Sequence, residues 1–153
     1  MPSQGFALRP IELCDLPTLK HWRGLPDIQR HLRHPTTSWP QHLAWWWRTK
    51  HDRTCRVWAI TLNGELVGIG GFYYRRLGAA EVSVIVMSDG VEDWAAERYV
   101  VEHLLTPAGR KWGLYVLYAE VLSTAPLKRH TVFPTHGTVT ADTYSTLYRW
   151  SIT

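Results

Sequence analysis

Residues 55–126 read CRVWAITLNGELVGIGGFYYRRLGAAEVSVIVMSDGVEDWAAERYVVEHLLTPAGRKWGLYVLYAEVLSTAP, and this stretch decides the fold. Its first residues, 56–62, are mostly apolar and β-branched, which predicts a strand. Asn63-Gly64 then supplies two residues that tolerate positive φ, as a type I′ turn requires, and Glu65 begins a returning strand. The sequence therefore predicts a tight β-hairpin here.

A strand, a helix and another strand are predicted after the hairpin. Residues 80–87 contain an uninterrupted apolar run, which is typical of a strand buried on both faces. Residues 92–105 have the periodicity of an amphipathic helix, which Pro107 and Gly109 are expected to end. Residues 115–122 read as a second buried strand. A strand-helix-strand crossover places its two strands parallel, so we expect a central parallel pair.

The flanking residues predict shorter elements. Ser38 followed three residues later by Gln41 is a capping-box pattern, so a helix is expected to start there and to end near His51. Asp15 is a candidate N-cap, with Pro17 in the first turn of another helix. The remaining predicted elements are a strand over 6–11, a short helix over 26–32 and a last strand over 143–152.

Length and composition limit the class of protein. A chain of 153 residues is long enough for one domain, so residues 1–153 are read as a single domain. Cys14 and Cys55 cannot build a disulfide framework, which favours a reducing compartment. No signal segment or membrane-spanning apolar run is apparent, so we expect a soluble, cytoplasmic protein without a membrane partner. The net charge of +4 favours anionic partners.

Metal binding and hydrolytic chemistry are weakly supported. His31 and His34 have one-turn spacing, but Pro35 follows at once and no third ligand is near in sequence. No metal site is therefore predicted. Neither cysteine has a neighbouring base in a recognisable arrangement, and no G-x-S-x-G motif occurs, so a nucleophilic hydrolase is not predicted either.

The order of elements resembles the GNAT superfamily of N-acyltransferases, particularly its branch of ribosomal-protein and small-molecule N-acetyltransferases. The resemblance covers nearly the whole chain. It rests on four segments, LRPIELCDLPTLKHWR (8–23), WAITLNGELVGIGGF (58–72), AEVSVIV (80–86) and LYAEVLSTAP (117–126). The implied fold combines helices and strands: it is α/β in the broad sense and α+β in the strict one. Its mixed, mostly antiparallel sheet contains a central parallel pair that splays apart, and helices flank the sheet.

The resemblance implies an acyl-CoA-dependent N-acyltransferase, with acetyl-CoA as donor and a primary amine as acceptor. The amine would belong to a small molecule, a protein or a nucleic-acid-borne group. The coenzyme's pantetheine arm would lie in the split, against the backbone of Ile85, Val86 and Met87. Its pyrophosphate would sit at the start of the following helix, near Trp94, Ala95 and Ala96.

The chain departs from the family pattern at the phosphate site. The family has a basic or amide residue, two spacers, a glycine, a spacer and a small residue, whereas residues 88–96 read SDGVEDWAA. Trp94 obstructs close backbone approach, and Glu92 and Asp93 would repel a pyrophosphate. An ordinary helix start capped by acids, without a phosphate site, is the alternative reading. The family's tyrosine also falls near Val132 or Phe133, which carry no exchangeable proton.

Several side chains remain as candidates for the chemistry. Glu81 on the central strand is a candidate general base, although pairing with Arg75 or Arg76 would explain it equally. Ser123 is a candidate proton donor and Thr124 a candidate ligand of the coenzyme's amide, and either could instead cap the next helix. The candidate acceptor-binding residues are Tyr73, Tyr74, Trp39 and His136.

A second class of function stays open. A degenerate GNAT-fold protein without coenzyme A binding could use its cleft or basic surface for nucleic acid or another ligand. The segment HWRGLPDIQRHLRHP (21–35) with Trp39 and Trp45 to Trp47 combines cations and aromatics, as single-strand binding surfaces do. A solvated charged helix is the plainer reading of that segment. Dimer formation is possible and is left undecided by the sequence.

Overall fold

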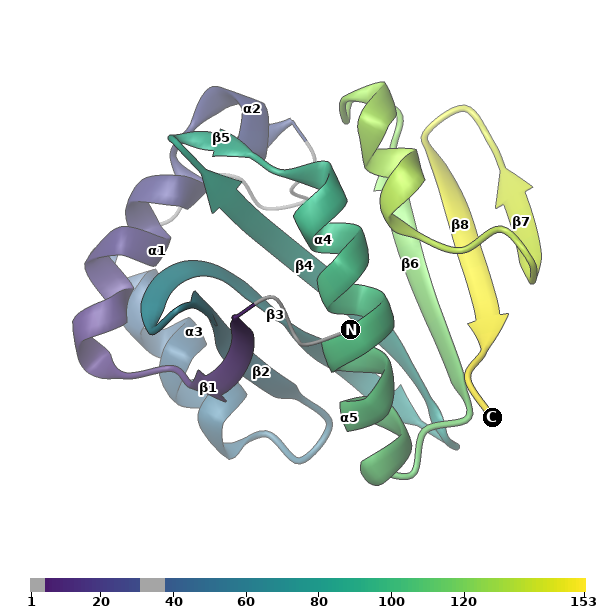
Figure 1. Ribbon diagram of the computed structural model, residues 1–153, viewed down its shortest axis with the longest axis horizontal. Coiled ribbons are helices and arrows are strands. Elements are labelled where there is room, and N and C mark those ends of the chain that lie inside the picture. The colour runs from purple at the N-terminus through teal and green to yellow at the C-terminus, as the bar shows by residue number, and fades with distance from the viewer. Residues whose placement is uncertain (1–4, 31–37) are drawn as a thin grey trace.

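The computed structural model describes residues 5–30 and 38–153. Figure 1 shows the elements in chain order. The strands are β1 (Phe6–Pro10), β2 (Arg56–Leu62), β3 (Glu65–Arg76), β4 (Ala79–Ser88), β5 (Val91–Glu92), β6 (Val116–Leu122), β7 (Thr138–Ala141) and β8 (Ser145–Ser151). The α-helices are α1 (Leu16–Arg23), α2 (Pro26–Gln29), α3 (Trp39–His51), α4 (Trp94–Val100) and α5 (Thr106–Lys111). Three further helical segments are the 3-10 helices η1 (Leu13–Asp15) and η3 (Leu127–Val132) and the π-helix η2 (Val101–Leu105).

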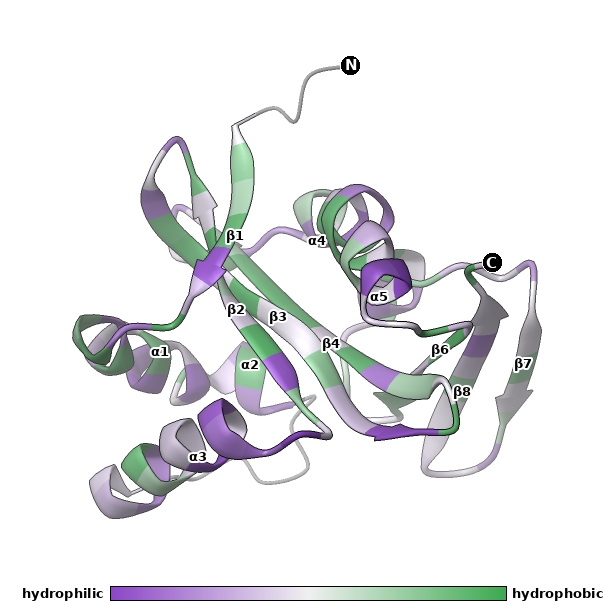
Figure 2. Cartoon of the chain, turned by 90° about the horizontal axis from the view of Figure 1, so that it is seen from below, coloured by the Kyte–Doolittle hydropathy of each residue, from purple (hydrophilic) through white to green (hydrophobic). Residues whose placement is uncertain are grey.

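The main sheet has the strand order β1-β2-β3-β4-β6-β8-β7, with β5 paired to β4. Within residues 5–30 and 38–153, only the pairing of β4 with β6 is parallel, and the other strand pairs are antiparallel. Figure 2 shows α1, α2 and α3 on one face of the sheet and α4 and α5 on the other. The predicted α+β architecture, with a mixed sheet and a central parallel pair, is confirmed.

The hairpin and the capped helix form as predicted. Leu62 pairs with Glu65, and the turn residues Asn63 and Gly64 have φ values of 52° and 87°, which is the left-handed region that a type I′ turn needs. Ser38 accepts a hydrogen bond from the backbone N–H of Gln41, and the Gln41 side chain returns the bond to the backbone N–H of Ser38. Local sequence therefore suffices for both features.

The predicted helix over 92–105 is wrong at both ends. It begins at Trp94, because Asp93 is the N-cap and accepts a hydrogen bond from the backbone N–H of Ala96. It also continues through Pro107 as far as Lys111. The π-helical turn η2 precedes Pro107, which lies in the first turn of α5, where a missing N–H is tolerated.

Other differences are smaller. Asp15 makes no capping bond to α1 and instead binds the Arg9 guanidinium through two hydrogen bonds of 2.7 and 2.8 Å. The sequence also missed β7, because its residues are all exposed and show no burial pattern. The short helix predicted over 26–32 is α2, and residues 31 and 32 of that prediction lie outside the described residues.

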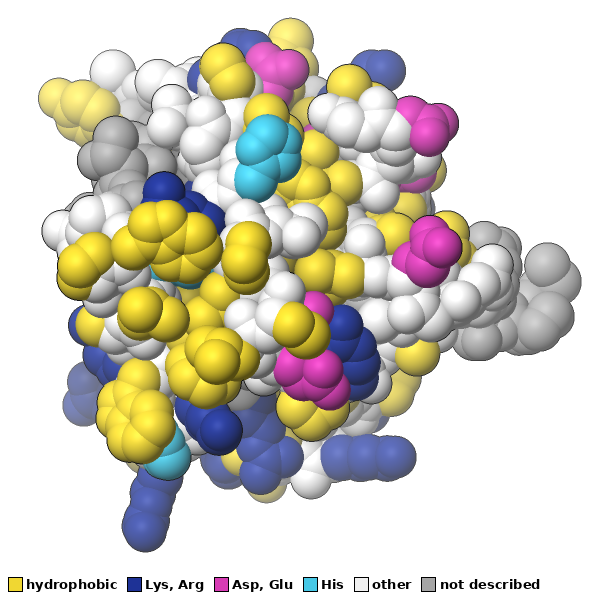
Figure 3. All heavy atoms as spheres, turned by 90° about the vertical axis from the view of Figure 1, so that its left-hand side faces the viewer, with side chains coloured by type: hydrophobic (Ala, Val, Ile, Leu, Met, Phe, Trp, Pro, Cys, Tyr) yellow, Lys and Arg dark blue, Asp and Glu magenta, His cyan; other side chains and the backbone are white. Residues whose placement is uncertain are grey.

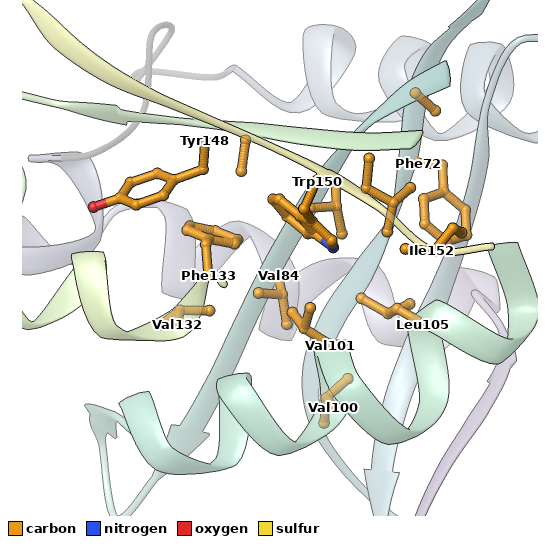
Figure 4. Packing of buried hydrophobic residues seen from close by; sticks show 14 of the residues in the cluster. Phe72, Val84, Val100, Val101, Leu105, Val132, Phe133, Tyr148, Trp150 and Ile152 are labelled. Atoms are coloured by element: carbon orange, nitrogen blue, oxygen red, sulfur yellow. The ribbon is translucent and has the colours of Figure 1, made fainter. Parts of the chain in front are cut away.

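The main core lies between the sheet and the α4-η2-α5 helix. Figure 4 shows Val84 of β4 and Val101 and Leu105 of η2 packed toward Trp150 of β8. Phe72 is fully buried in the same cluster. Alternate residues of β4, such as Val82 and Val84, point into this core. The residues between them, among them Glu81, Ser83 and Ile85, lie on the opposite face of the sheet, and Ser83 and Ile85 face α1 and α3. In the described part of the chain, no helix is long and apolar enough to cross a membrane.

Candidate active site at the fork between β4 and β6

The two central strands part soon after they meet. Their parallel pairing covers Ala79 to Glu81 on β4 and Val116 to Tyr118 on β6, and no further pairing joins them. Figure 1 shows the two strands diverging from this point, with α4 in front of the gap. The predicted splayed pair is therefore present, and Glu81 and Tyr118 lie opposite each other at the fork.

A shallow pocket of about 390 Å³ lies at the fork, on the face of the sheet away from α4. Successive side chains of a strand point to opposite faces of the sheet, so residues two apart on a strand share a face. The residues that line this pocket therefore come from alternate positions of neighbouring strands. Glu81 comes from β4, Tyr118 and Glu120 come from β6, and Leu147 and Arg149 come from β8. Tyr74, which has a φ of 56° at an irregular point of β3, completes the pocket.

The fork pocket contains groups suited to proton transfer from an amine. Glu81 and Glu120 are carboxylates that attract a protonated amine and can accept its proton. Tyr118 supplies a phenol that can donate or accept a hydrogen bond. Ser145 donates a hydrogen bond of 3.1 Å to Glu120 and so orients that carboxylate. Arg149 adds a positive charge to the lining of the pocket.

Beyond the fork, the split holds a cluster of three buried charged residues, Glu92, Glu97 and Arg129, called the Glu–Arg cluster below. Arg129 comes from η3 and its Nη1 lies 3.0 Å from Glu97 Oε1 and 3.3 Å from Glu92 Oε2. The exposed fraction of the side chain is 7% for Arg129, 0% for Glu97 and 3% for Glu92. This ionic cluster is therefore almost completely withdrawn from water.

The cluster has two acids for one cation. Burial raises the pKa of Glu97 well above its ordinary value, and the neighbouring Glu92 adds to the rise, while the charge of Arg129 opposes it. Two adjacent carboxyl groups in a dry site cannot both ionise without a large electrostatic cost. We therefore expect the pair of glutamates to retain a proton at a pH where an exposed glutamate would be ionised.

The cluster also occupies the edge of β4 that the implied coenzyme would use. Arg129 Nη1 donates a 2.9 Å hydrogen bond to the carbonyl of Val84, and the N–H of Val86 donates a 3.0 Å bond to Glu97 Oε2. The carbonyl of Val86 accepts a 2.8 Å bond from the N–H of Asp93. In this conformation, a pantetheine arm can bind that edge only if these side chains release it.

The helix start is equally unsuited to a pyrophosphate. The backbone N–H of Ala96 is engaged by the Asp93 side chain, and Glu92 stands beside it in the Glu–Arg cluster. Trp94 is half-buried and packs against the main core. Acidic side chains and Trp94 therefore lie at the start of α4, where the sequence resemblance placed the pyrophosphate, and the altered phosphate site stays a prediction.

The other predicted site residues lie in several places. Ile85 and Met87 are buried with Ile28 of α2 in a second, smaller core, whereas Val86 lies in the main core. Ala95 is exposed, and Trp39 and His136 are exposed at the start of α3 and in the loop before β7. Of the predicted residues, the structure brings two together with Glu81: Tyr74 lines the same pocket, and Tyr73 is the partner of Glu81 in the pairing of β3 with β4.

Ser123 and Thr124 lie at the far end of β6 from the fork. Five residues separate Ser123 from Tyr118, which is roughly 16 Å of extended strand. The Thr124 hydroxyl donates a 2.6 Å hydrogen bond to the carbonyl of Arg30, and Arg30 Nε donates back to the carbonyl of Thr124. Both residues are therefore away from Glu81, and their predicted chemical roles stay predictions.

Tyr73 lines a second cavity, of about 70 Å³, between the sheet and helices α1 and α3. Burial raises the pKa of the Tyr73 phenol. His42 lies in the same cavity, and its Nε2 is 3.1 Å from the carbonyl of Leu16, while its buried Nδ1 has no hydrogen-bond partner among the residues that the structure describes. Burial lowers the pKa of His42, so we expect a neutral ring with Nδ1 as an acceptor.

Sequence reasoning missed Tyr118, Glu120, Arg149, Glu97 and Arg129. The first three alternate along β6 and β8 and could have been found from the period-2 pattern once the strand pairing was known. Arg129 had no local signal, since it follows β6 by several residues in what reads as a basic loop. Among the described residues, no three His, Cys, Asp or Glu side chains are arranged to hold a metal ion. The pair His31 and His34 lies outside the described residues.

Comparison with known proteins identifies the fold. No family model and no curated protein matches the sequence. Among solved structures, spermidine N-acetyltransferase from Vibrio cholerae matches with a TM-score of 0.78 at 14% identity, covering 96% of this chain and 95% of that one. A domain from Methanocaldococcus jannaschii matches with a TM-score of 0.77 at 18% identity, covering 95% and 97%.

The GNAT domain of S. lividans PAT matches with a TM-score of 0.69 at 19% identity, covering 94% of this chain and 89% of that one. The matches span nearly the whole chain, including the fork between β4 and β6. The chain therefore has the fold of the GNAT N-acetyltransferases.

Proposed function

We propose that this protein is an N-acyltransferase that uses acetyl-CoA to acylate a primary amine at the fork between β4 and β6. The observation that carries the proposal is the fork pocket, where Glu81 and Glu120 stand beside Tyr118 at the point where the strands part. The solved structure of spermidine N-acetyltransferase, which contains CoA and spermine, supports a coenzyme donor and an amine acceptor.

The fork residues have distinct roles in this proposal. The two carboxylates attract the protonated amine from solvent, and Glu81 removes a proton so that the nitrogen lone pair becomes a nucleophile. Tyr118 faces Glu81 across the fork and can hydrogen-bond to a group held there. When bound, the coenzyme's thioester supplies the activated acyl carbonyl. Arg149, which lines the pocket, disfavours acceptors with a second cation close to the reacting amine.

The Glu–Arg cluster controls entry to the split in this proposal. Arg129 and Glu97 must release Val84 and Val86 before an extended pantetheine arm can bind the same backbone groups. Part of the coenzyme's binding energy would therefore be used to open the cluster. We expect weaker coenzyme binding than in a chain whose β4 edge is open.

A second candidate function rests on the same cluster. If Glu97 and Arg129 hold the split closed permanently, the chain is a GNAT-fold binding protein without coenzyme chemistry. The specific observation in its favour is that three backbone groups of Val84 and Val86 already have internal partners. The two candidates differ in whether acetyl-CoA binds at all.

Thermal unfolding with and without acetyl-CoA separates the candidates. A ligand at about 100 times its dissociation constant adds roughly 2.7 kcal/mol to the free energy of unfolding, which for this size is a shift of roughly 5–10 °C. ATP at the same concentration is the control for general anion binding. A shift with acetyl-CoA that exceeds any shift with ATP, followed by transfer to a monoamine acceptor, supports the acyltransferase. A shift at millimolar acetyl-CoA that is no larger than the shift with ATP supports the binding protein.

A further inference from the structure

A groove rich in cations lies away from the fork, between the end of α3 and the strands β2 and β3. It encloses about 690 Å³ and shares no lining residue with the fork pocket. Its cations are Lys50, Arg53, Arg56 and Arg75, and these four residues with their aromatic neighbours Trp46, Trp58 and Trp112 are called the basic groove below. Figure 3 shows the face of the molecule at the left of Figure 1, where lysine and arginine side chains gather along the lower edge beside hydrophobic side chains.

Tryptophan rings hold three of these cations in place. The guanidiniums of Arg56 and Arg75 lie 4.8 and 4.6 Å from the centroid of the Trp112 ring, and the ammonium of Lys50 lies 4.9 Å from that of Trp46. A cation over an indole face is attracted by the negative face of the ring. Because two guanidiniums contact one ring, both positive charges are kept beside Trp112.

These cations are not neutralised within the described part of the chain. None of Lys50, Arg56 and Arg75 takes part in the ion pairs found there. One carboxylate, Asp52, lines the groove, and it accepts hydrogen bonds of 2.8 and 2.7 Å from the backbone N–H and hydroxyl of Thr54. Four cations therefore face one carboxylate that already has local partners.

The chemistry of the groove points to a ligand that is anionic at one end and apolar at the other. Guanidinium groups bind phosphate oxygens in pairs, and an adjacent ammonium adds a point charge. Trp58, Ile11 and Val57 add apolar lining. A volume of about 690 Å³ lies within the usual range for small-molecule sites. A nucleotide combines a phosphate with a flat, apolar base and has dimensions of this order.

We propose that the basic groove binds the phosphate of a nucleotide, carried either by a free nucleotide or by a single nucleic-acid strand. The phosphate lies between Arg56 and Arg75, with Lys50 at the side. Trp46 comes from the tryptophan run in α3 that suggested nucleic acid in the sequence. Arg56, Arg75 and Trp112 come from β2, β3 and the residue after α5, and only folding brings them together.

The test uses three probes with the full chain: inorganic phosphate, ADP and a fluorescent oligothymidine. Calorimetry measures the first two and fluorescence anisotropy measures the third. Arg56→Gln and Arg75→Gln are expected to weaken binding at least tenfold each, and Lys50→Gln about threefold. Arg76→Gln is the matched control, because Arg76 is the exposed neighbour of Arg75 and does not line the groove. It is expected to leave binding unchanged.

The outcomes separate the sources of phosphate. Comparable affinity for ADP and for the oligonucleotide supports a free nucleotide. Binding of the oligonucleotide alone supports a strand, with a slope of log affinity against log salt of about −2 if three cations contact phosphates. The proposal is overturned if Arg76→Gln weakens binding as much as Arg75→Gln, because diffuse surface charge would then suffice. It is also overturned if no probe binds at millimolar concentration in low salt.

Discussion

Removing Arg129 tests the Glu–Arg cluster most directly. In Arg129→Met, Glu97 and Glu92 lose their shared cation while they stay buried, and the carbonyl of Val84 loses its donor. Breaking a buried ion pair by removing one partner costs about 3–5 kcal/mol, because an uncompensated charge is left behind. For a domain of this size that loss lowers the Tm by roughly 6–20 °C.

The stability lost in Arg129→Met should increase as the pH rises. Burial already raises the pKa of Glu97, and removing Arg129 raises it further because the opposing positive charge is gone. The folded state then binds more protons than the unfolded state, so the free energy of unfolding falls as pH rises above the ordinary glutamate pKa of about 4.3. The free energy of unfolding of Arg129→Met is therefore expected to differ least from that of the unmodified protein at pH 5 and most at pH 8.

Urea unfolding at pH 5 and pH 8 measures this difference, and a double variant supplies the control. Glu97→Gln combined with Arg129→Met replaces the charged pair by neutral groups of similar size, and at least half of the lost stability should return at pH 8. A deficit below about 1 kcal/mol, or one that is equal at both pH values, would refute the reasoning. The loss would then come from side-chain packing and not from charge.

Three further predictions address catalysis, local structure and the core. Glu81→Gln should lower the rate of acyl transfer about 10²–10⁴-fold and leave the acetyl-CoA shift unchanged; an unaltered turnover number would remove Glu81 from the mechanism. Ser38→Ala should cost about 1 kcal/mol in urea unfolding because the capping bond to Gln41 is lost, and no loss would mean that water replaces it. Phe72→Ala should cost about 3–5 kcal/mol because Phe72 is fully buried; a loss under 1 kcal/mol would contradict its place in the core.

Local sequence was sufficient where the deciding interactions are short-range. The type I′ turn at Asn63-Gly64 and the capping box at Ser38 depend on residues within three positions of each other. The alternating and continuous apolar patterns of β2 and β4 likewise identified strands before any pairing was known. The helix after β4 was misjudged because Pro107 ordinarily ends a helix, and the π-turn that accommodates it is not visible in a residue pattern.

The candidate site was foreseen in part. Glu81 was predicted as a candidate because the resemblance places its strand beside the split, and the structure puts Glu81 and Tyr74 in the same pocket. Tyr118, Glu120 and Arg149 were not recognised, because their meeting depends on the register of β6 with β4 and β8. Ser123 and Thr124 follow the same strand but lie at its other end, a separation that sequence proximity conceals.

The sequence by itself determined the kinds and the order of most elements, and it places the acids Glu92 and Asp93 before the helix that follows β4. Each of these depends on side-chain type at neighbouring positions. Tertiary structure alone decided that Arg129 enters the split, that Glu97 binds the backbone of Val86, and that Arg56 and Arg75 share Trp112. These contacts join segments far apart in the chain. Their partners are chosen by the packing of η3 against α4 and by strand register, which no local pattern records.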